Sequence, residues 1–158
     1  MRKLILTSFA IFVGFAFMNA QDIADNAIGL RIGDNDGLGT EISYQRALGD
    51  NNRLELDLGW RSGNSFTAFQ LTGLYQWVWQ LDGDFNWYAG VGGGVASINF
   101  DNNDIDGDTF VFAAGDIGIE YNFDFPLQLS LDFRPELGFG DYRDDLDFDI
   151  AFSVRYRF

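Results

Sequence analysis

The sequence contains no cysteine and no histidine, and each absence excludes a class of chemistry. Without cysteine there is no disulfide framework, no lipidated N-terminal cysteine and no thiolate nucleophile. Without histidine there is no Ser–His or Cys–His pair and no imidazole ligand for a metal. Paired carboxylates such as Asp132 and Glu136 could still do acid–base work, but both flank Arg134, which favours an ion cluster. We therefore expect neither an enzyme nor a bound cofactor.

Basic residues are scarce as well. The chain of 158 residues has 10 Lys and Arg against 24 Asp and Glu, so its formal net charge is −14. Binding of nucleic acid needs clustered cations that displace counterions, so no nucleic-acid partner is expected. Every cation after residue 20 is an arginine, whose planar guanidinium suits bidentate pairing with carboxylates.

Residues 1–20 have the layout of a cleaved secretory signal peptide. Arg2 and Lys3 form a basic start, residues 4–18 are uncharged and mostly apolar, and Ala20 offers a small residue before a cut ahead of Gln21. The alternative is a retained membrane helix, but the apolar run is shorter than the ~20 residues that span a bilayer. We expect residues 21–158 to form a single mature domain.

No later stretch is long and apolar enough for a transmembrane helix, and the hydrophobic period is two instead. Eight segments carry bulky apolar residues at alternate positions, and the opposite face of each is small, polar or charged. The segments are residues 28–32, 38–44, 54–60, 69–79, 87–95, 111–121, 127–139 and 148–158. Short turns rich in Gly, Asn and Asp alternate with generally longer loops. This pattern predicts an all-β fold, a closed eight-stranded antiparallel up-and-down barrel.

Three features favour an apolar face that points outward. The interior of an eight-stranded barrel is narrow, and the polar face has the smaller side chains. The apolar face avoids charge, as the lipid penalty of ~2–4 kcal/mol for a central Arg or Lys predicts. Aromatic residues fall near both ends of the strands, as in the two belts of a membrane barrel. The predicted belts contain Tyr44, Trp60, Trp77, Trp79, Trp87, Tyr121, Phe139 and Phe148. Pro135 lacks a ladder donor and predicts a local bulge or a shifted bond.

The last segment alternates up to a terminal aromatic residue, through Phe152, Val154, Tyr156 and Phe158. This resembles the C-terminal assembly signal of bacterial outer-membrane proteins. Over residues 21–158 the chain resembles the small eight-stranded OmpX/OmpA-type barrels. The resemblance implies a place in the bacterial outer membrane after export, in contact with its lipid and lipopolysaccharide, and recognition by the barrel-assembly machinery. No peptidoglycan-binding domain is expected after Phe158.

The polar face predicts an ion-pair network inside the barrel. Its expected members are Arg31, Glu41, Glu55, Asp57, Arg61, Asp116, Glu120, Asp132, Arg134, Glu136, Asp149, Arg155 and Arg157. Because an unpaired buried charge is strongly destabilising, the favoured interpretation is a structural plug that fills the barrel. The alternative is a narrow cation-selective path.

The longer loops are acidic, and residues 102–108 resemble the start of a calcium loop. Asp104, Asp106 and Asp108 are weak candidate ligands, because Ala113 stands where the bidentate Glu would be. Solvated loops are the favoured interpretation, and weak binding of divalent cations that bridge to lipopolysaccharide phosphates is the alternative. For the whole protein we expect a structural or surface-interaction role. A cation channel and a soluble ligand-binding barrel are the alternatives.

Overall fold

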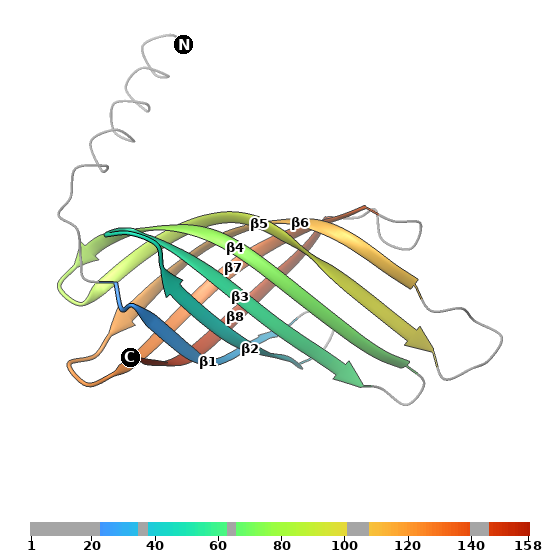
Figure 1. Ribbon diagram of the computed structural model, residues 1–158, viewed down its shortest axis with the longest axis horizontal. Coiled ribbons are helices and arrows are strands. Elements are labelled where there is room, and N and C mark those ends of the chain that lie inside the picture. Colours follow the sequence, from blue (N-terminus) through green and yellow to red (C-terminus); the bar gives the residue numbers. More distant parts are fainter. Residues whose placement is uncertain (1–22, 35–37, 63–65, 101–107, 140–145) are drawn as a thin grey trace, which may run out of the picture.

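A computed structural model describes residues 23–34, 38–62, 66–100, 108–139 and 146–158 (Figure 1). Within these ranges no helix is long and apolar enough to cross a membrane. The strands are β1 (Asn26–Asp34), β2 (Leu38–Ala47), β3 (Asn52–Ser62), β4 (Phe66–Asp82), β5 (Phe85–Phe100), β6 (Asp108–Asn122), β7 (Leu127–Phe139) and β8 (Leu146–Arg157).

The eight strands form a closed barrel in sequence order. Each strand is antiparallel to the next, and β8 pairs with β1 from Ala27 opposite Arg157 to Gly33 opposite Ala151. The predicted eight-stranded up-and-down barrel is therefore confirmed. Closure gives every strand a partner on both sides, which removes the unpaired edge that an open sheet would leave.

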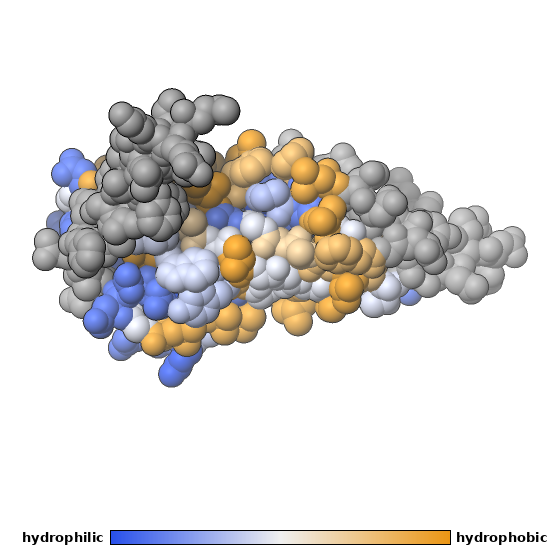
Figure 2. All heavy atoms as spheres, turned by 90° about the horizontal axis from the view of Figure 1, so that it is seen from above, coloured by the Kyte–Doolittle hydropathy of each residue, from blue (hydrophilic) through white to orange (hydrophobic). Residues whose placement is uncertain are grey.

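Strict alternation places the two faces of each strand in different surroundings. In β7, Leu131 is 49% exposed on the outer wall, whereas its neighbour Asp132 is 4% exposed and points inward. Every strand has exposed hydrophobic residues on the outside, and the buried charged residues lie on the inside. Figure 2 shows hydrophobic side chains gathered along the wall and hydrophilic ones at the end that carries the short turns. Around its buried charges the barrel is thus polar inside and apolar outside.

The two ends of the barrel differ in shape. At one end, which we call the turn end, short connections join β2 to β3, β4 to β5 and β6 to β7; in the second of these, Gly83 has a φ of 53° that favours glycine. At the other end, which we call the loop end, β4, β5 and β6 reach beyond the neighbouring strands (Figure 1). These three strands have 17, 16 and 15 residues, against 9 in β1 and 10 in β2.

Pro135 interrupts the pairing of β7 with β6 but does not shift the register of the two strands. On the β6 side, Ala114 lies opposite Glu136 and Ile117 lies opposite Phe133, so the register is the same on both sides of the proline. The predicted bulge is wrong, because the missing donor is absorbed by a local gap in the ladder. Gly115 faces this gap, and a Cβ there would lie 3.3 Å from Cγ of Pro135.

Candidate functional site

The candidate site is the interior of the barrel, where the inward residues of all eight strands converge. Four arginines are at most 2% exposed there: Arg31, Arg53, Arg134 and Arg155. Eight carboxylates are at most 9% exposed beside them: Glu41, Glu55, Asp57, Asp116, Glu120, Asp132, Glu136 and Asp149. Charges this deeply buried are tolerated only when they are paired and hydrogen-bonded.

The first cluster of ion pairs is built around Arg31 and Arg134. Nη1 of Arg31 lies 3.0 Å from Oε2 of Glu41 and 2.5 Å from Oδ2 of Asp149, and its Nη2 lies 2.5 Å from Oδ1 of Asp132. Nη2 of Arg134 lies 2.7 Å from Oε1 of Glu41 and 3.6 Å from Oδ2 of Asp149. Glu41 and Asp149 therefore join the two arginines into one cluster that links β1, β2, β7 and β8.

Arg134 brings two further carboxylates into this cluster. Its Nη1 donates to Oδ2 of Asp57 at 3.1 Å, and its Nε lies 3.0 Å from Oε1 of Glu136. Gln70 also donates to Glu136, at 3.0 Å. Small residues make room for the cluster: a Cβ on Gly33 would lie 2.5 Å from Oδ1 of Asp149.

The second cluster lies toward the turn end. Nη2 of Arg155 lies 3.1 Å from Oε1 of Glu55, and Nη1 of Arg53 lies 2.6 Å from Oε2 of Glu120. Gln76 joins the two pairs, because it accepts from Nε of Arg53 at 2.5 Å and donates to Glu55 at 3.2 Å. The guanidinium of Arg53 also lies 4.7 Å from the ring centre of Tyr88.

The interior is acidic on balance. Eight carboxylates against four arginines leave an excess of four among the described interior side chains. Seven of the carboxylates lie within 4 Å of an arginine, and the eighth, Asp116, accepts from Gln76 at 2.5 Å. The two clusters thus hold most of the buried charge of the described interior.

The structure brings together eleven of the thirteen residues expected in the interior network, three arginines and eight carboxylates. Arg157 departs from the prediction. It lies at the rim of the turn end, where Nη2 donates to the carbonyl oxygens of Phe123 at 2.5 Å and Phe125 at 3.4 Å. Being the last residue of β8, it is too near the open end to reach the buried carboxylates. The side chain of Arg61 lies outside the described residues.

Arg53 is an interior residue that the sequence prediction missed. It follows Asn51 and Asn52, so it reads as part of a turn. The alternation of β3 nevertheless continues back from Asp57 and Glu55 to Arg53, and that period was the available signal. Two neutral residues of the interior, Asn86 and Tyr88, were missed too.

An apolar cluster on the inner face of β4, β5 and β6 corrects a second expectation, that this face is small, polar or charged. Its buried members are Leu74, Ala96, Phe110, Phe112 and Ala114, with Ile98 packed against them. Phe110 and Phe112 are 4% and 5% exposed. The charged interior therefore does not continue along these strands to the loop end.

At the loop end the outer face of β5 and β6 becomes polar, whereas the inner face there is apolar. Val95 and Val111 are 46% and 51% exposed and lie opposite each other, but the next outward pair is Ser97 and Thr109, whose hydroxyls are 3.2 Å apart. On β5 and β6, inside and outside thus exchange polarity beyond Val95 and Val111, whereas on β4 Phe69, opposite Ser97, is still 53% exposed on the outer face. An outward surface of hydroxyls over an inward apolar cluster is the arrangement of a sheet in water.

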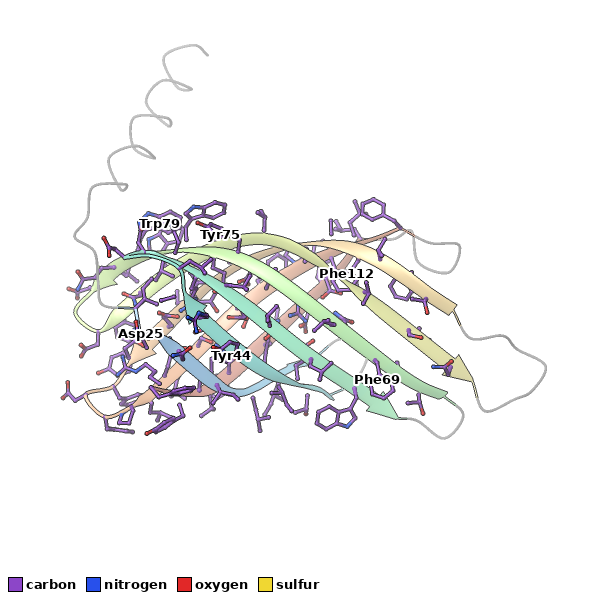
Figure 3. All side chains as sticks on the ribbon, in the orientation of Figure 1. Asp25, Tyr44, Phe69, Tyr75, Trp79 and Phe112 are labelled. Atoms are coloured by element: carbon purple, nitrogen blue, oxygen red, sulfur yellow. The ribbon has the colours of Figure 1, made fainter. Side chains whose placement is uncertain are left out.

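The eight predicted belt aromatics all lie on the outer face and near the two ends of the strands. Trp79 stacks on Trp87 at 4.4 Å between ring centres at the turn end, and Phe148 stacks on Phe133 at 5.5 Å nearer the loop end. Figure 3 shows Trp79 and Tyr75 at the turn end and Phe69 at the loop end. The residues of the expected assembly signal, Phe152, Val154, Tyr156 and Phe158, are also outward and between 39% and 61% exposed.

The candidate metal ligands cannot be placed. Asp104 and Asp106 lie outside the described residues, and so does the side chain of Asp108. Among the residues that the structure describes, no group of three or more acidic side chains is arranged to hold a metal ion.

No protein-family model matches the chain, and no curated protein matches it in sequence. Solved structures do match its fold. The N-terminal β-barrel domain of Pseudomonas aeruginosa OprF superposes with a TM-score of 0.72 at 14% identity, over 85% of this chain and 98% of that domain. Neisserial surface protein A (NspA) gives 0.63 at 12% identity, over 84% of this chain and 94% of its own. Ail, the attachment invasion locus protein of Yersinia pestis, gives 0.58 at 13% identity, over 84% and 96%. The chain thus has the fold of the small eight-stranded outer-membrane barrels.

Proposed function

We propose that residues 21–158 form an integral protein of the bacterial outer membrane, exported with residues 1–20 as a cleaved signal peptide. Its role is structural or one of surface interaction, and its interior does not conduct. We also propose that the barrel-assembly machinery recognises Phe152, Val154, Tyr156 and Phe158 as the C-terminal assembly signal. The likeness in fold to OprF, NspA and Ail supports this proposal.

One observation carries the proposal: the wall is apolar and the interior is charged. Exposed residues such as Leu30, Leu58, Ile117 and Phe152 lie on four different strands and are each 45–51% exposed. Soluble monomers rarely expose contiguous apolar patches above a few hundred Å². A wall of this kind all round the barrel is stable only when lipid or detergent covers it, at roughly 25 cal/mol per Å² removed from water.

The change of polarity at the loop end gives the outer limit of the membrane. A strand tilted at about 45° needs about 9–11 residues to cross the hydrocarbon core. β5 has 16, and the outward serine at position 97 follows the last outward valine at position 95. We place the outer interface at this level, so that the ends of β4, β5 and β6 stand in water.

The two alternatives fit the geometry less well. A soluble ligand-binding barrel needs an apolar interior, whereas this interior holds four arginines and eight carboxylates. A cation path would have to pass two clusters of ion pairs and then the phenyl rings of Phe110 and Phe112. Eight-stranded barrels have interiors just wide enough for side chains. The excess of four carboxylates is the single feature that favours a cation path.

The surface role rests on the acidic loops. Residues 101–108 contain four aspartates and residues 141–147 contain four more, with Arg143 as the single cation. Ail has been solved with the heparin analogue sucrose octasulfate, which is an anion. The acidic segments of the present chain would repel such an anion, so we propose cationic partners, or divalent cations that bridge these segments to lipopolysaccharide phosphates.

Fractionation combined with a heat-shift gel tests the proposal. The full chain is expressed with its N-terminal segment, membranes are separated, and the outer-membrane fraction is run in cold and in boiled detergent. We expect the mature chain in that fraction, with a mobility that changes on boiling. A matched variant, Leu58→Asp on the outer wall, should lower the folded fraction. Recovery of the wild type as a soluble, unshifted protein would contradict the proposal.

Conductance in a planar bilayer separates the structural role from the channel. We expect no steady current through the wild-type barrel at any salt concentration, because both clusters and the apolar cluster block the interior. Steady cation-selective current from protein that passes the heat-shift test would favour the channel instead.

A further inference from the structure

We propose that the outer face of β1 and β2 at the turn end binds a zwitterionic phospholipid headgroup that carries a phosphate and a primary ammonium. This inference rests on the proposed function, because it needs the barrel to stand in a bilayer. The site is built on Arg46 and Asn26, which lie opposite each other in the β1–β2 ladder. No other described exposed outward-facing side chain is a cation.

Arg46 is available to an external anion. Its two neighbours along the strand, Gln45 and Ala47, face inward, while Arg46 is exposed on the outer wall. Among the described residues no carboxylate lies within ion-pair distance of it, in contrast to every buried arginine. Its opposite neighbours are Asn26 on β1 and Leu54 on β3, neither of which is charged.

Asn26 adds a second donor. Its Oδ1 accepts a hydrogen bond from the hydroxyl of Tyr44 at 2.7 Å, which orients the amide and leaves its nitrogen as the free group. Asn52, diagonal to Arg46 on β3, carries a second amide and is the third donor. Guanidinium and amide donors on one face, without an acceptor carboxylate among them, suit a phosphate. Arginine in particular binds phosphate oxygens through its planar fork.

The height of this patch matches the headgroup region. Arg46 lies two residues beyond Tyr44, which belongs to the aromatic belt at the turn end, and Trp77 lies opposite Asn52. Aromatic side chains of this kind sit at the interface between hydrocarbon and water. A long cation just beyond the belt reaches the phosphate level and keeps its aliphatic stem against the apolar wall.

Two acidic residues near Arg46 favour an ethanolamine headgroup over a choline or an anionic one. Asp25 is exposed and directly precedes Asn26, and its backbone carbonyl accepts from the backbone nitrogen of Ala47 at 3.0 Å, so the residue is held opposite Ala47, one position along from Arg46. Asp50 is exposed in the turn that follows β2. These carboxylates can accept from the N–H groups of an ethanolamine ammonium. A choline has no N–H to donate, and a headgroup with net negative charge is repelled.

Native mass spectrometry of retained lipid tests the site. The full-length mature barrel is reconstituted in vesicles of equal parts phosphatidylethanolamine, phosphatidylcholine and phosphatidylglycerol, extracted in mild detergent, and its bound lipids are counted. We expect phosphatidylethanolamine to be enriched over both others. Arg46→Gln should lower the total amount of retained phospholipid by on the order of tenfold, because two charge-assisted hydrogen bonds to the phosphate are lost.

Asp25→Asn tests the ammonium half of the site. We expect it to remove the preference for ethanolamine over choline while total bound phospholipid is kept. Asp124→Asn, which removes the same charge from the β6–β7 turn, is the matched control and should keep the preference. Equal retention of the three lipids by the wild type, or an unchanged Arg46→Gln variant, would overturn the site while the heat-shift test still supports the membrane barrel. Failure of the wild type to insert at all would overturn both.

Discussion

The interior of the barrel contains two regions with opposite chemistry. Between the aromatic belts it holds ion pairs among Arg31, Arg53, Arg134, Arg155 and their carboxylates, and the wall outside is apolar. On β4, β5 and β6 toward the loop end it holds Phe110, Phe112 and Ala96, and the wall outside carries Ser97 and Thr109. The same alternation of side chains runs through both regions. On the proposed placement in the membrane, lipid surrounds one region and water the other, and this difference accounts for which set of residues faces out.

The two interiors also hold the strands together in different ways. An ion pair joins specific atoms, so Arg31 on β1 selects Asp132 on β7 and Asp149 on β8. The apolar cluster is held by burial and shape, which are not directional. We therefore expect loss of one arginine to destabilise the strands on both sides of the β8–β1 pairing. Loss of one phenyl ring should destabilise mainly β4, β5 and β6.

The largest effect is expected at Arg31. Arg31→Met removes the cation from three buried carboxylates, and breaking a buried pair in this way typically costs about 3–5 kcal/mol. The free energy of unfolding is measured in vesicles by urea titration followed through tryptophan fluorescence. Arg157→Met is the control, because the described partners of Arg157 are backbone carbonyls at the rim, and it should cost about 1 kcal/mol. Equal losses of unfolding free energy for Arg31→Met and Arg157→Met would contradict the role given to the buried ion pairs.

A smaller loss is expected in the apolar cluster. Phe112→Ala leaves a cavity on the inner face of β6, and we expect it to cost about 3 kcal/mol in the same urea titration. The loss should be accompanied by faster hydrogen exchange of amides in β4, β5 and β6 and unchanged exchange in β1 and β8. Exchange that rises equally in all eight strands would show that the two regions are not separate.

A pair of charge substitutions on β5 sharpens the boundary between the regions. Val91→Arg places a charge in the middle of the apolar wall and should lower the free energy of unfolding by about 2 kcal/mol or more. Ser97→Arg, on the same face of the same strand, should have an effect near zero because that side chain is in water. If Ser97→Arg costs as much as Val91→Arg, the membrane limit is misplaced.

The smallest effect is expected at Tyr88. This side chain is fully buried, and its hydroxyl has no hydrogen-bond partner among the described residues. Its ring covers Gly118, where any Cβ would meet the ring atoms, and it lies over the guanidinium of Arg53. Tyr88→Phe keeps both contacts and should change the free energy of unfolding by less than about 0.5 kcal/mol. A loss above about 1 kcal/mol would mean that the hydroxyl is bonded in the folded barrel.

The architecture could be predicted from the sequence because each strand repeats one simple signal. Alternation over eight segments, separated by turn residues, specifies strands, and neighbouring antiparallel strands follow from the short turns. The inward positions of Glu41, Asp57 and Asp132 follow from the same period. Which carboxylate meets which arginine does not, because Arg31 and Asp132 are 101 residues apart and meet only once β8 closes on β1.

The errors have separate causes. Phe110 and Phe112 were not expected inside, because the sequence was interpreted with a single polarity rule that holds only where lipid surrounds the wall. Arg53 was hidden by the turn residues before it, and Arg157 was assigned by alternation alone although the barrel is open at that level. At Pro135 the sequence indicates the missing donor but not whether the strand gives way by shifting or by leaving one gap.

Labelling of single cysteines along β5 tests the central claim most directly, because the natural chain has no cysteine and each introduced thiol is unique. Val91→Cys, Val95→Cys, Ser97→Cys and Asn99→Cys are spin-labelled in vesicles, and collisions with oxygen in lipid are compared with collisions with a water-soluble nickel complex. The account predicts that positions 91 and 95 favour oxygen and that positions 97 and 99 favour nickel, with the change between 95 and 97. Access to nickel at all four positions would contradict it and would mean that the apolar wall does not face lipid.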